Sequence, residues 1–288
     1  MDFRAIIAGL AFALMWSSAF TSARIIVTNA PPLMVSSVRF LIAGLVTLAI
    51  ARALGQSFRL TPQQWRLTIV FGVCQNALYL GLNFVAMQTV EASVAVIIAS
   101  SLPLWVALAG WVIWRETMRP LAIIGLIGGF VGMGVIMGTR LGAGLDPFGV
   151  FLCVLGVLAL TFATLSVRGA SAGGNVLTVV GFQMLVGAIA LALPASFETW
   201  TVNWSPTLVI AILYTIFVPG VIATITWFWL VNRIGTVRAA TFHFLNPFLG
   251  VAVAAALLGE ALAPLDIAGV VIIALSILAV QVSRTRST

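Results

Sequence analysis

Charged residues are scarce in this sequence, and lysine is absent from it. Charged residues occupy 7% of the 288 positions, whereas about 25% is usual for a soluble domain. All fourteen basic residues are arginines, and they lie mostly in short polar segments where membrane topology accounts for them. The net charge of +7 therefore does not indicate a nucleic-acid partner, and the composition excludes an ordinary soluble protein.

Cysteine, histidine and acidic residues are also few. Cys74 and Cys153 lie inside apolar segments and predict neither a disulfide nor a metal site. An intramembrane serine protease would need a serine paired with His243, the single histidine, but no glycine-framed serine motif is present. The acidic residues all fall in loops or at the ends of apolar segments: Asp2, Glu91, Glu116, Asp146, Glu198, Glu260 and Asp266. We therefore expect no enzyme, no metal and no cofactor.

Apolar residues are abundant and occur in long runs. They make up 62% of the chain, whose mean hydropathy is +1.19. The runs are long enough for helices that cross a hydrocarbon core of about 30 Å, whereas an outer-membrane barrel would show alternating segments of about ten residues. We predict an all-α integral membrane protein of a bacterial inner membrane, in direct contact with the lipid bilayer. Its ten helices are expected at 5–27, 32–52, 65–87, 90–114, 120–138, 147–167, 175–193, 206–231, 235–258 and 264–282.

The arginines predict the orientation of these helices. If both termini are cytoplasmic, eleven arginines fall on the cytoplasmic side: Arg4, Arg52, Arg59, Arg66, Arg115, Arg119, Arg168, Arg233, Arg238, Arg284 and Arg286. Only Arg24 and Arg140 fall outside, and Arg39 lies within a helix. This distribution follows the positive-inside rule and so favours both the orientation and the number of helices.

The two halves of the chain resemble each other at an offset of 144 residues. Without a gap, this offset aligns Pro103 with Pro247, Glu116 with Glu260, Pro120 with Pro264, Gly125 with Gly269 and Arg24 with Arg168. Each half, 1–144 and 145–288, then contains five helices, so the second half enters the membrane with the opposite orientation. Inverted repeats are a transporter architecture that binds substrate near the membrane midplane.

Several motifs resemble those of a known family. They are WSSAFTSAR at 16–24, PPLMVSSVRFLIAG at 31–44, SLPLWVALAGWVIWRE at 101–116 and FLNPFLGVAVAAALLGE at 244–260. With them, essentially the whole chain resembles two EamA domains of the drug/metabolite transporter superfamily, and it is most similar to the YddG-type bacterial amino-acid exporters. The resemblance implies ten helices in two domains and export of aromatic and other amino acids. It also implies a structural or path-lining role for the arginine at position 39.

Arg39 is the one arginine placed inside a predicted helix. It follows Pro32 by seven residues, which puts it about 10 Å below the outer end of its helix at 1.5 Å per residue. At this depth an arginine either snorkels toward the headgroups and anchors the helix, or faces a water-filled path. We expect an anchor in the outer leaflet and keep the transport path as the alternative.

Aromatic and polar residues inside the helices mark a candidate cavity. Asn76, Tyr79 and Asn83 share one helix face and either line a cavity or hydrogen-bond neighbouring helices. Trp16 lies too deep for an interfacial aromatic belt. The predicted wall of a substrate-binding cavity, formed by helices one, three, four, six, eight and nine, consists of Trp16, Ser17, Tyr79, Asn83, Ser100, Trp105 and Asn246, with Gln183, His243 and Trp227 as further candidates.

Prolines and carboxylates at equivalent positions of the two halves predict local helix geometry. Pro103 and Pro247 are expected either to kink the fourth and ninth helices or to unwind them and free backbone carbonyls for a substrate. Glu116 and Glu260 precede the fifth and tenth helices by a few residues and are expected to stabilise the positive ends of those helices. The glycine-rich fifth and tenth helices are expected to pack closely, either at the periphery or at a dimer-like seam.

The residues inside the helices discriminate between substrates. A proton-coupled exporter of cationic drugs would need an intramembrane carboxylate, and a nucleotide-sugar carrier would need several cations, but the helices contain neither. A zwitterion can be held by amides, hydroxyls and backbone groups between aromatic walls. We predict facilitative export of aromatic and other apolar amino acids by alternating access. The alternatives are a proton-coupled exporter of another small metabolite or drug, and a membrane scaffold or sensor; a monomer is compatible with the sequence.

Overall fold

The protein is helical throughout the residues that its computed structural model describes, which are 3–115, 118–142, 144–166, 174–235, 239, 241–261 and 263–285. The α-helices are α1 (Phe3–Val27), α2 (Pro32–Ala53), α3 (Pro62–Phe71), α4 (Gly81–Ala86), α5 (Ala92–Ser100), α6 (Leu102–Trp114), α7 (Pro120–Gly142), α8 (Pro147–Ser166), α9 (Val176–Ala195), α10 (Pro206–Thr215), α11 (Ala223–Ile234), α13 (Asn246–Leu258) and α14 (Pro264–Thr285). Two π-helices, η1 (Gly72–Leu80) and η2 (Ile216–Ile222), and one 3₁₀-helix, η3 (Thr241–Leu245), join some of them.

Eight single or composite helices in the described residues are long and apolar enough to cross a membrane. Two shorter apolar helices, Phe242–Leu258 and Pro264–Val280, follow them. Each of the ten predicted segments therefore contains helix, but the last two have a shorter described apolar length than we expected. The long, apolar helices identify an integral membrane protein.

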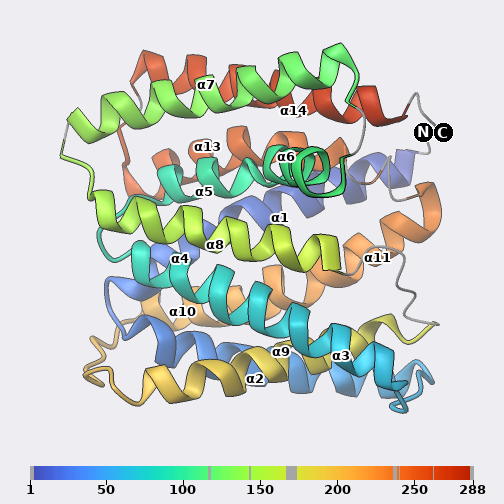
Figure 1. Cartoon of the computed structure of the whole chain (residues 1–288). Coiled ribbons are helices and arrows are strands. Elements are labelled where there is room, and N and C mark those ends of the chain that lie inside the picture. Colours follow the sequence, from blue (N-terminus) through green and yellow to red (C-terminus); the bar gives the residue numbers. More distant parts are fainter. Residues whose placement is uncertain are drawn as a thin grey trace.

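The helices run side by side in one elongated bundle (Figure 1). Helix α2 packs against α9 at one edge, and α7 packs against α14 at the opposite edge. Helix α1 lies between these pairs and contacts α10, α11, α13 and α5. The start of α1 and the end of α14 lie at the same end of the bundle, which we call the terminal end.

The backbone N–H groups at the start of α2 and of α9 are capped by side chains from the segment that follows the partner helix. The Glu198 carboxylate accepts hydrogen bonds from the N–H groups of Leu33 and Met34 at 2.9 and 2.8 Å. The Gln56 amide oxygen accepts from Leu177 and Thr178 at 2.9 and 3.1 Å. Each helix start needs such partners because its first N–H groups have no acceptor within the helix. The reciprocal caps require α2 and α9 to pack antiparallel.

Glu260 does not stabilise the helix that follows it in sequence, as we had expected. Its carboxylate accepts from the N–H groups of Ala92 and Ser93 at 2.8 and 2.9 Å and so caps α5. The start of α14 has its own acid, Asp266, which accepts from Ala263 N–H at 2.9 Å. The chain brings Glu260 to α5 because α13 packs against α5. Glu116 lies outside the described residues.

Three of the predicted continuous helices contain a change of helix type, and a fourth is interrupted. Both π-helices lie inside composite helices, α3–η1–α4 and α10–η2–α11, and their first residues are 144 positions apart. The fourth predicted helix is interrupted at Ser101, between α5 and α6, and Pro103 lies in the first turn of α6. Pro247 likewise lies in the first turn of α13, after the 3₁₀-helix. A proline is tolerated there because it has no N–H to leave unpaired.

The edge pair α7 and α14 crosses at glycines, as expected for glycine-rich peripheral helices. A Cβ atom added to Gly132 would lie 2.9 Å from a side-chain carbon of Ile272 and 3.2 Å from the carbonyl oxygen of Gly269. A Cβ added to Gly269 would lie 2.4 Å from Ile136. Small residues let the two backbones approach, which is how helices gain packing energy in a membrane.

We predict that Gly132→Val separates α7 from α14 and lowers stability by about 1–3 kcal/mol, the usual cost of overpacking. Gly134→Val is the matched control, because Gly134 is exposed on the same helix and a Cβ there would meet nothing within 4 Å. Thermal unfolding of the two variants in detergent compares them directly. Equal melting temperatures would contradict the assigned helix crossing.

Candidate functional site

Helix α1 is held at the centre of the bundle by buried hydroxyl groups. The Ser17 hydroxyl donates to the backbone carbonyl of Asn246 in α13 at 3.3 Å. The hydroxyls of Ser18 and Tyr214 are 2.6 Å apart, and Thr215 donates to the Ser22 hydroxyl at 2.8 Å, which ties α1 to α10. The hydroxyls of this serine-rich stretch thus join α1 to α10 and α13 in the second half of the chain.

A cavity of about 830 Å³ lies beside the deep part of α1. It reaches the terminal end of the bundle, because Gln64 in the first turn of α3, Val176 at the start of α9 and Asn232 near the end of α11 line it. This volume lies in the usual range of about 300–1,000 Å³ for small-molecule sites. Helices α1, α6, α8, α11 and α13 and the π-helix η1 contribute to the wall as predicted, and α9 contributes more than the single residue expected of it.

Aromatic rings form one side of this cavity. The Phe12 ring lies 5.1 Å from the rings of both Trp227 and His243 and 5.8 Å from that of Trp16. The Trp227 and His243 rings are 5.0 Å apart. His243 is also 3.0 Å from the Asn246 side-chain nitrogen through its Nδ1 atom. Contacts of this kind stabilise the arrangement of the rings. They also give the cavity an apolar surface, on which the ring faces carry partial negative and the ring edges partial positive charge.

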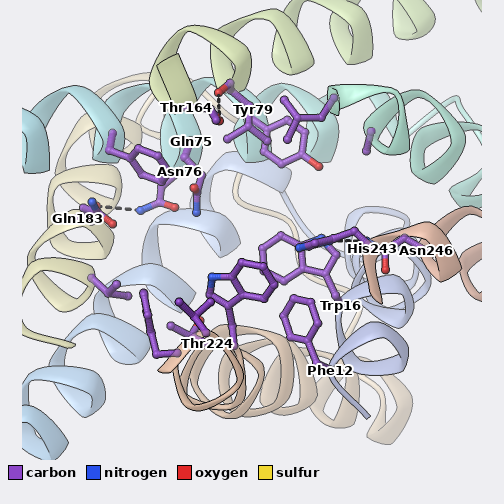
Figure 2. Close-up of a pocket in the computed structure, with 18 of the residues that line it drawn as sticks. Phe12, Trp16, Gln75, Asn76, Tyr79, Thr164, Gln183, Thr224, His243 and Asn246 are labelled. Carbon is purple, nitrogen blue, oxygen red and sulfur yellow. Dashed lines mark hydrogen bonds between the residues drawn. The ribbon is translucent and has the colours of Figure 1, made fainter. Parts of the chain in front are cut away.

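Neutral polar groups face the aromatic rings across the cavity (Figure 2). Gln75, Asn76 and Tyr79 project from η1, with Thr164 on α8, whereas Thr224 lies on the side of the aromatic rings, on the same helix α11 as Trp227. The Asn76 amide donates to the backbone carbonyl of Gln183 at 2.8 Å, so this residue both lines the cavity and joins two helices. None of the residues described as lining the large cavity is an aspartate, a glutamate or an arginine.

A smaller cavity of about 80 Å³ continues from the large one toward the end of the bundle opposite the termini. The two cavities share wall residues, among them Trp16, Gln75 and Tyr79. Arg39, Asn83 and Met87 line only the smaller one. Beyond it, the Arg24 guanidinium donates to the backbone carbonyl of Met87 and joins α1 to the end of α4.

The structure places most of the predicted wall residues around these two cavities. The large cavity is lined by Trp16, Tyr79, Ser100, Pro103, Gln183, Trp227, His243 and Asn246, and the small one by Trp16, Tyr79, Asn83 and Arg39. This placement is a matter of geometry; binding of a substrate by these residues stays a prediction.

Three predicted residues lie outside both walls. Ser17 is fully buried against Asn246 and serves the α1–α13 contact. Trp105 turns to the other side of α6, where it packs on Phe130 at 4.9 Å and donates its indole N–H to the Ser101 hydroxyl at 3.1 Å. Pro247 is buried in the first turn of α13. The helix is interrupted at Ser101, two residues before Pro103, where the sequence predicted a kink or local unwinding.

Arg39 requires a different correction. It does not reach the exposed end of α2, because only 6% of its surface is accessible. The guanidinium carbon instead lies 4.0 Å from the centre of the Phe40 ring and 4.4 Å from that of the Phe84 ring. Arg39 therefore does not snorkel to the headgroups but lies in the wall of the small cavity, and its part in a transport path stays a prediction.

Sequence reasoning missed several wall residues. Gln75 lines both cavities beside Asn76, although neighbouring residues of a regular α-helix point about 100° apart. Both lie in the π-helix η1, whose wider turn changes the facing of its side chains. Thr224 follows the second π-helix and also lines both cavities. The polar pair Gln75–Asn76 inside an apolar helix was the available signal.

Among the described residues, no group of three or more histidine, cysteine, aspartate or glutamate side chains is arranged to hold a metal ion. The two cysteines, Cys74 and Cys153, are free thiols. The chemistry of the site therefore comes from aromatic rings, amides, hydroxyls and one arginine, a set suited to binding a molecule reversibly.

The known proteins that this chain resembles are named as transporters. The chain is 24% identical over 269 residues to the uncharacterized transporter YvbV of Bacillus subtilis, covering 92% of this chain and 87% of that protein. It is 25% identical over 269 residues to the uncharacterized inner membrane transporter YedA of Escherichia coli K12, covering 90% and 85%. A crystal structure with 21% identity matches 100% of both chains with a TM-score of 0.70 and shares the fold.

A family profile matches the chain twice, over residues 3–138 and again over residues 147–281. These two matches cover nearly the whole sequence, and both begin at equivalent positions of the halves proposed from the sequence. The chain is a membrane protein that belongs to the EamA-like transporter family.

Proposed function

We propose that this transporter exports amino acids, aromatic and other apolar ones, from the cytoplasm across a bacterial inner membrane. The observation that carries the proposal is the chemistry of the large cavity, where an aromatic wall faces neutral amides and hydroxyls. An apolar side chain can lie against Phe12, Trp16 and Trp227, while the polar groups of the substrate meet the amides of η1.

The proposed mechanism is facilitative. Proton-coupled transport of a cation would place an ionisable carboxylate in the path, and none lines the described cavity walls. Glu198, Glu260 and Asp266 instead cap helix ends. An amino acid that is more concentrated inside the cell would then leave down its own gradient.

We propose further that residues 1–144 and 145–288 are two inverted five-helix repeats. Four observations support this assignment. The family profile matches both halves, the π-helices η1 and η2 begin 144 residues apart, and the capped N–H pairs at 33–34 and 177–178 differ by the same offset. The edge pairs α2–α9 and α7–α14 each join helices at equivalent positions.

Alternating access follows from this arrangement. The described arginines that we predicted to be cytoplasmic, such as Arg52, Arg66 and Arg233, lie at the terminal end of the bundle. The large cavity reaches that same end, whereas contacts such as the one between Arg24 and Met87 close the opposite end. With cytoplasmic termini, the structure is in an inward-facing state that can admit a cytoplasmic substrate.

The function is tested by transport of labelled phenylalanine into liposomes that contain the purified protein, with and without a pH gradient. We expect saturable flux that needs no gradient and is inhibited by other apolar amino acids. A quaternary ammonium compound and a nucleoside serve as competitors from other substrate classes. Inhibition by one of these, without phenylalanine flux, would contradict the proposed substrate.

Two tryptophans of α11 provide a matched pair of variants. Trp227 lines the large cavity, whereas Trp229, two residues along, is 40% exposed on the outer surface. We expect Trp227→Ala to lower the apparent affinity for phenylalanine about tenfold, since aromatic contacts contribute about 0.5–1.5 kcal/mol beyond area burial. Trp229→Ala is expected to transport normally, and equal losses in both variants would exclude this wall as the binding surface.

Orientation is tested with reporter fusions. Five helices in each half place Gly144 on the opposite side of the membrane from both termini. An alkaline phosphatase fused after Gly144 is therefore expected to be active, and one fused to the C-terminus inactive, with the reverse pattern for a green fluorescent protein. The same result at both positions would contradict the inverted repeat.

A further inference from the structure

Arg39 is a buried cation without a counter-charge. Neither its Nε nor its Nη2 atom has a hydrogen-bond partner, and no carboxylate of the described residues lies within ion-pair distance of it. Its neighbours Phe40 and Phe84 attract the cation through their ring faces but accept no hydrogen bonds from its N–H groups. An unpaired buried charge is costly, and buried charges in proteins are normally paired.

The small cavity also contains an unpaired hydrogen-bond acceptor. The Asn83 side chain is 99% buried, and its amide nitrogen donates to the backbone carbonyl of Tyr79 at 2.7 Å. This bond orients the amide, so that the Oδ1 atom is the one left without a partner. Arg39 and Asn83 line the same cavity of about 80 Å³. An unsatisfied donor group and an unsatisfied acceptor thus occur together.

We infer that the small cavity binds the α-amino and α-carboxylate groups of the transported amino acid. The guanidinium of Arg39 binds the carboxylate, and Asn83 Oδ1 accepts a hydrogen bond from the ammonium group. This inference rests on the proposed function and extends it by naming the residues that recognise the zwitterion.

The volume of the small cavity and its connection to the large cavity both fit this assignment. A space of about 80 Å³ exceeds the roughly 10–15 Å³ that one water needs by the same measure, so it has room for a group of a few heavy atoms. The wall that it shares with the large cavity includes Trp16, Phe20 and Met184. A substrate with its charged groups at Arg39 would therefore extend its side chain past these apolar residues into the large cavity.

The position of Arg39 also suits a transporter. It lies at the closed end of the cavity system, between the large cavity and the contact of Arg24 with Met87. A substrate that enters from the terminal end must cross the aromatic region before its carboxylate reaches the arginine. Recognition of the zwitterion then occurs at the place where the path must next open.

The inference is tested by ligand binding to the full chain in nanodiscs, measured as affinity and as thermal stabilisation. The probes are phenylalanine, phenylalaninamide, which lacks the carboxylate, and 3-phenylpropanoate, which lacks the ammonium group. For the wild type we expect phenylalaninamide to bind at least about tenfold more weakly than phenylalanine, because charged hydrogen bonds contribute about 1.5–3 kcal/mol. Equal affinities of these two probes in the wild type would overturn the carboxylate site without any variant.

Two substitutions separate the roles of the two residues. Arg39→Met is expected to weaken phenylalanine and 3-phenylpropanoate binding about 10- to 100-fold while leaving phenylalaninamide unchanged. Asn83→Leu is expected to weaken phenylalanine and phenylalaninamide but not 3-phenylpropanoate. We expect Arg39→Met to be at least as thermally stable as the wild type, because it removes an unpaired buried charge. A variant that fails to fold would make Arg39 a structural anchor and overturn its role in the site.

The outcomes also distinguish this inference from the proposed function. If 3-phenylpropanoate binds and Arg39→Met abolishes that binding, the carboxylate site stands even when phenylalanine is not transported. If phenylalanine is transported but Arg39→Met lowers acid and amide binding equally, the inference fails and amino-acid export stands.

Discussion

Every polar group inside the hydrocarbon core must find its partner within the protein, and the structure is organised around this requirement. Water cannot satisfy a side-chain hydroxyl at that depth. Buried serine and threonine hydroxyls therefore donate hydrogen bonds to nearby backbone carbonyls or join α1 to its neighbours. At the helix ends, Glu198, Gln56 and Glu260 cap helices that are distant in sequence. These bonds fix which helices lie side by side more strictly than apolar contacts alone can, because lipid is as apolar as leucine.

Several buried polar atoms are exceptions to this rule, and two of the residues that carry them, Arg39 and Asn83, line the small cavity. The other unpaired atoms are hydroxyls outside both cavity walls, on Thr21, Ser36, Ser93 and Thr178. Regular α-helical hydrogen bonding is also interrupted around the cavities, at η1 and η2, at Ser101 and at η3. Departures from regular helix are tolerated inside a membrane where the segment borders a cavity or is buried in protein. The irregular backbone therefore lies beside the same cavities as the unpaired atoms of Arg39 and Asn83.

The cavity chemistry separates the candidate substrates. A cationic drug would meet aromatic rings but no carboxylate, and a phosphate ester would meet one arginine in a space of about 80 Å³. A zwitterion with an apolar side chain matches the arrangement along its whole length: a cation and an acceptor at the closed end, then an aromatic wall toward the open end. The membership of the EamA-like transporter family establishes transport as the activity, and the cavity supplies the argument for the substrate.

The sequence by itself determined the class of the protein, because the length and polarity of an apolar segment decide whether it spans a membrane. It also identified the family, the close packing of α7 on α14 and most of the polar and aromatic residues that line the cavities, including Trp16, Tyr79 and His243. Only the tertiary structure decided that Gln75 joins the wall, that Trp105 leaves it and that Glu260 caps α5. Helix type and the partner of a capping carboxylate depend on segments far away in the chain, which local pattern does not record. The same is true of Arg39: the sequence located its charge inside the membrane, but whether that charge would be paired depended on side chains from other helices.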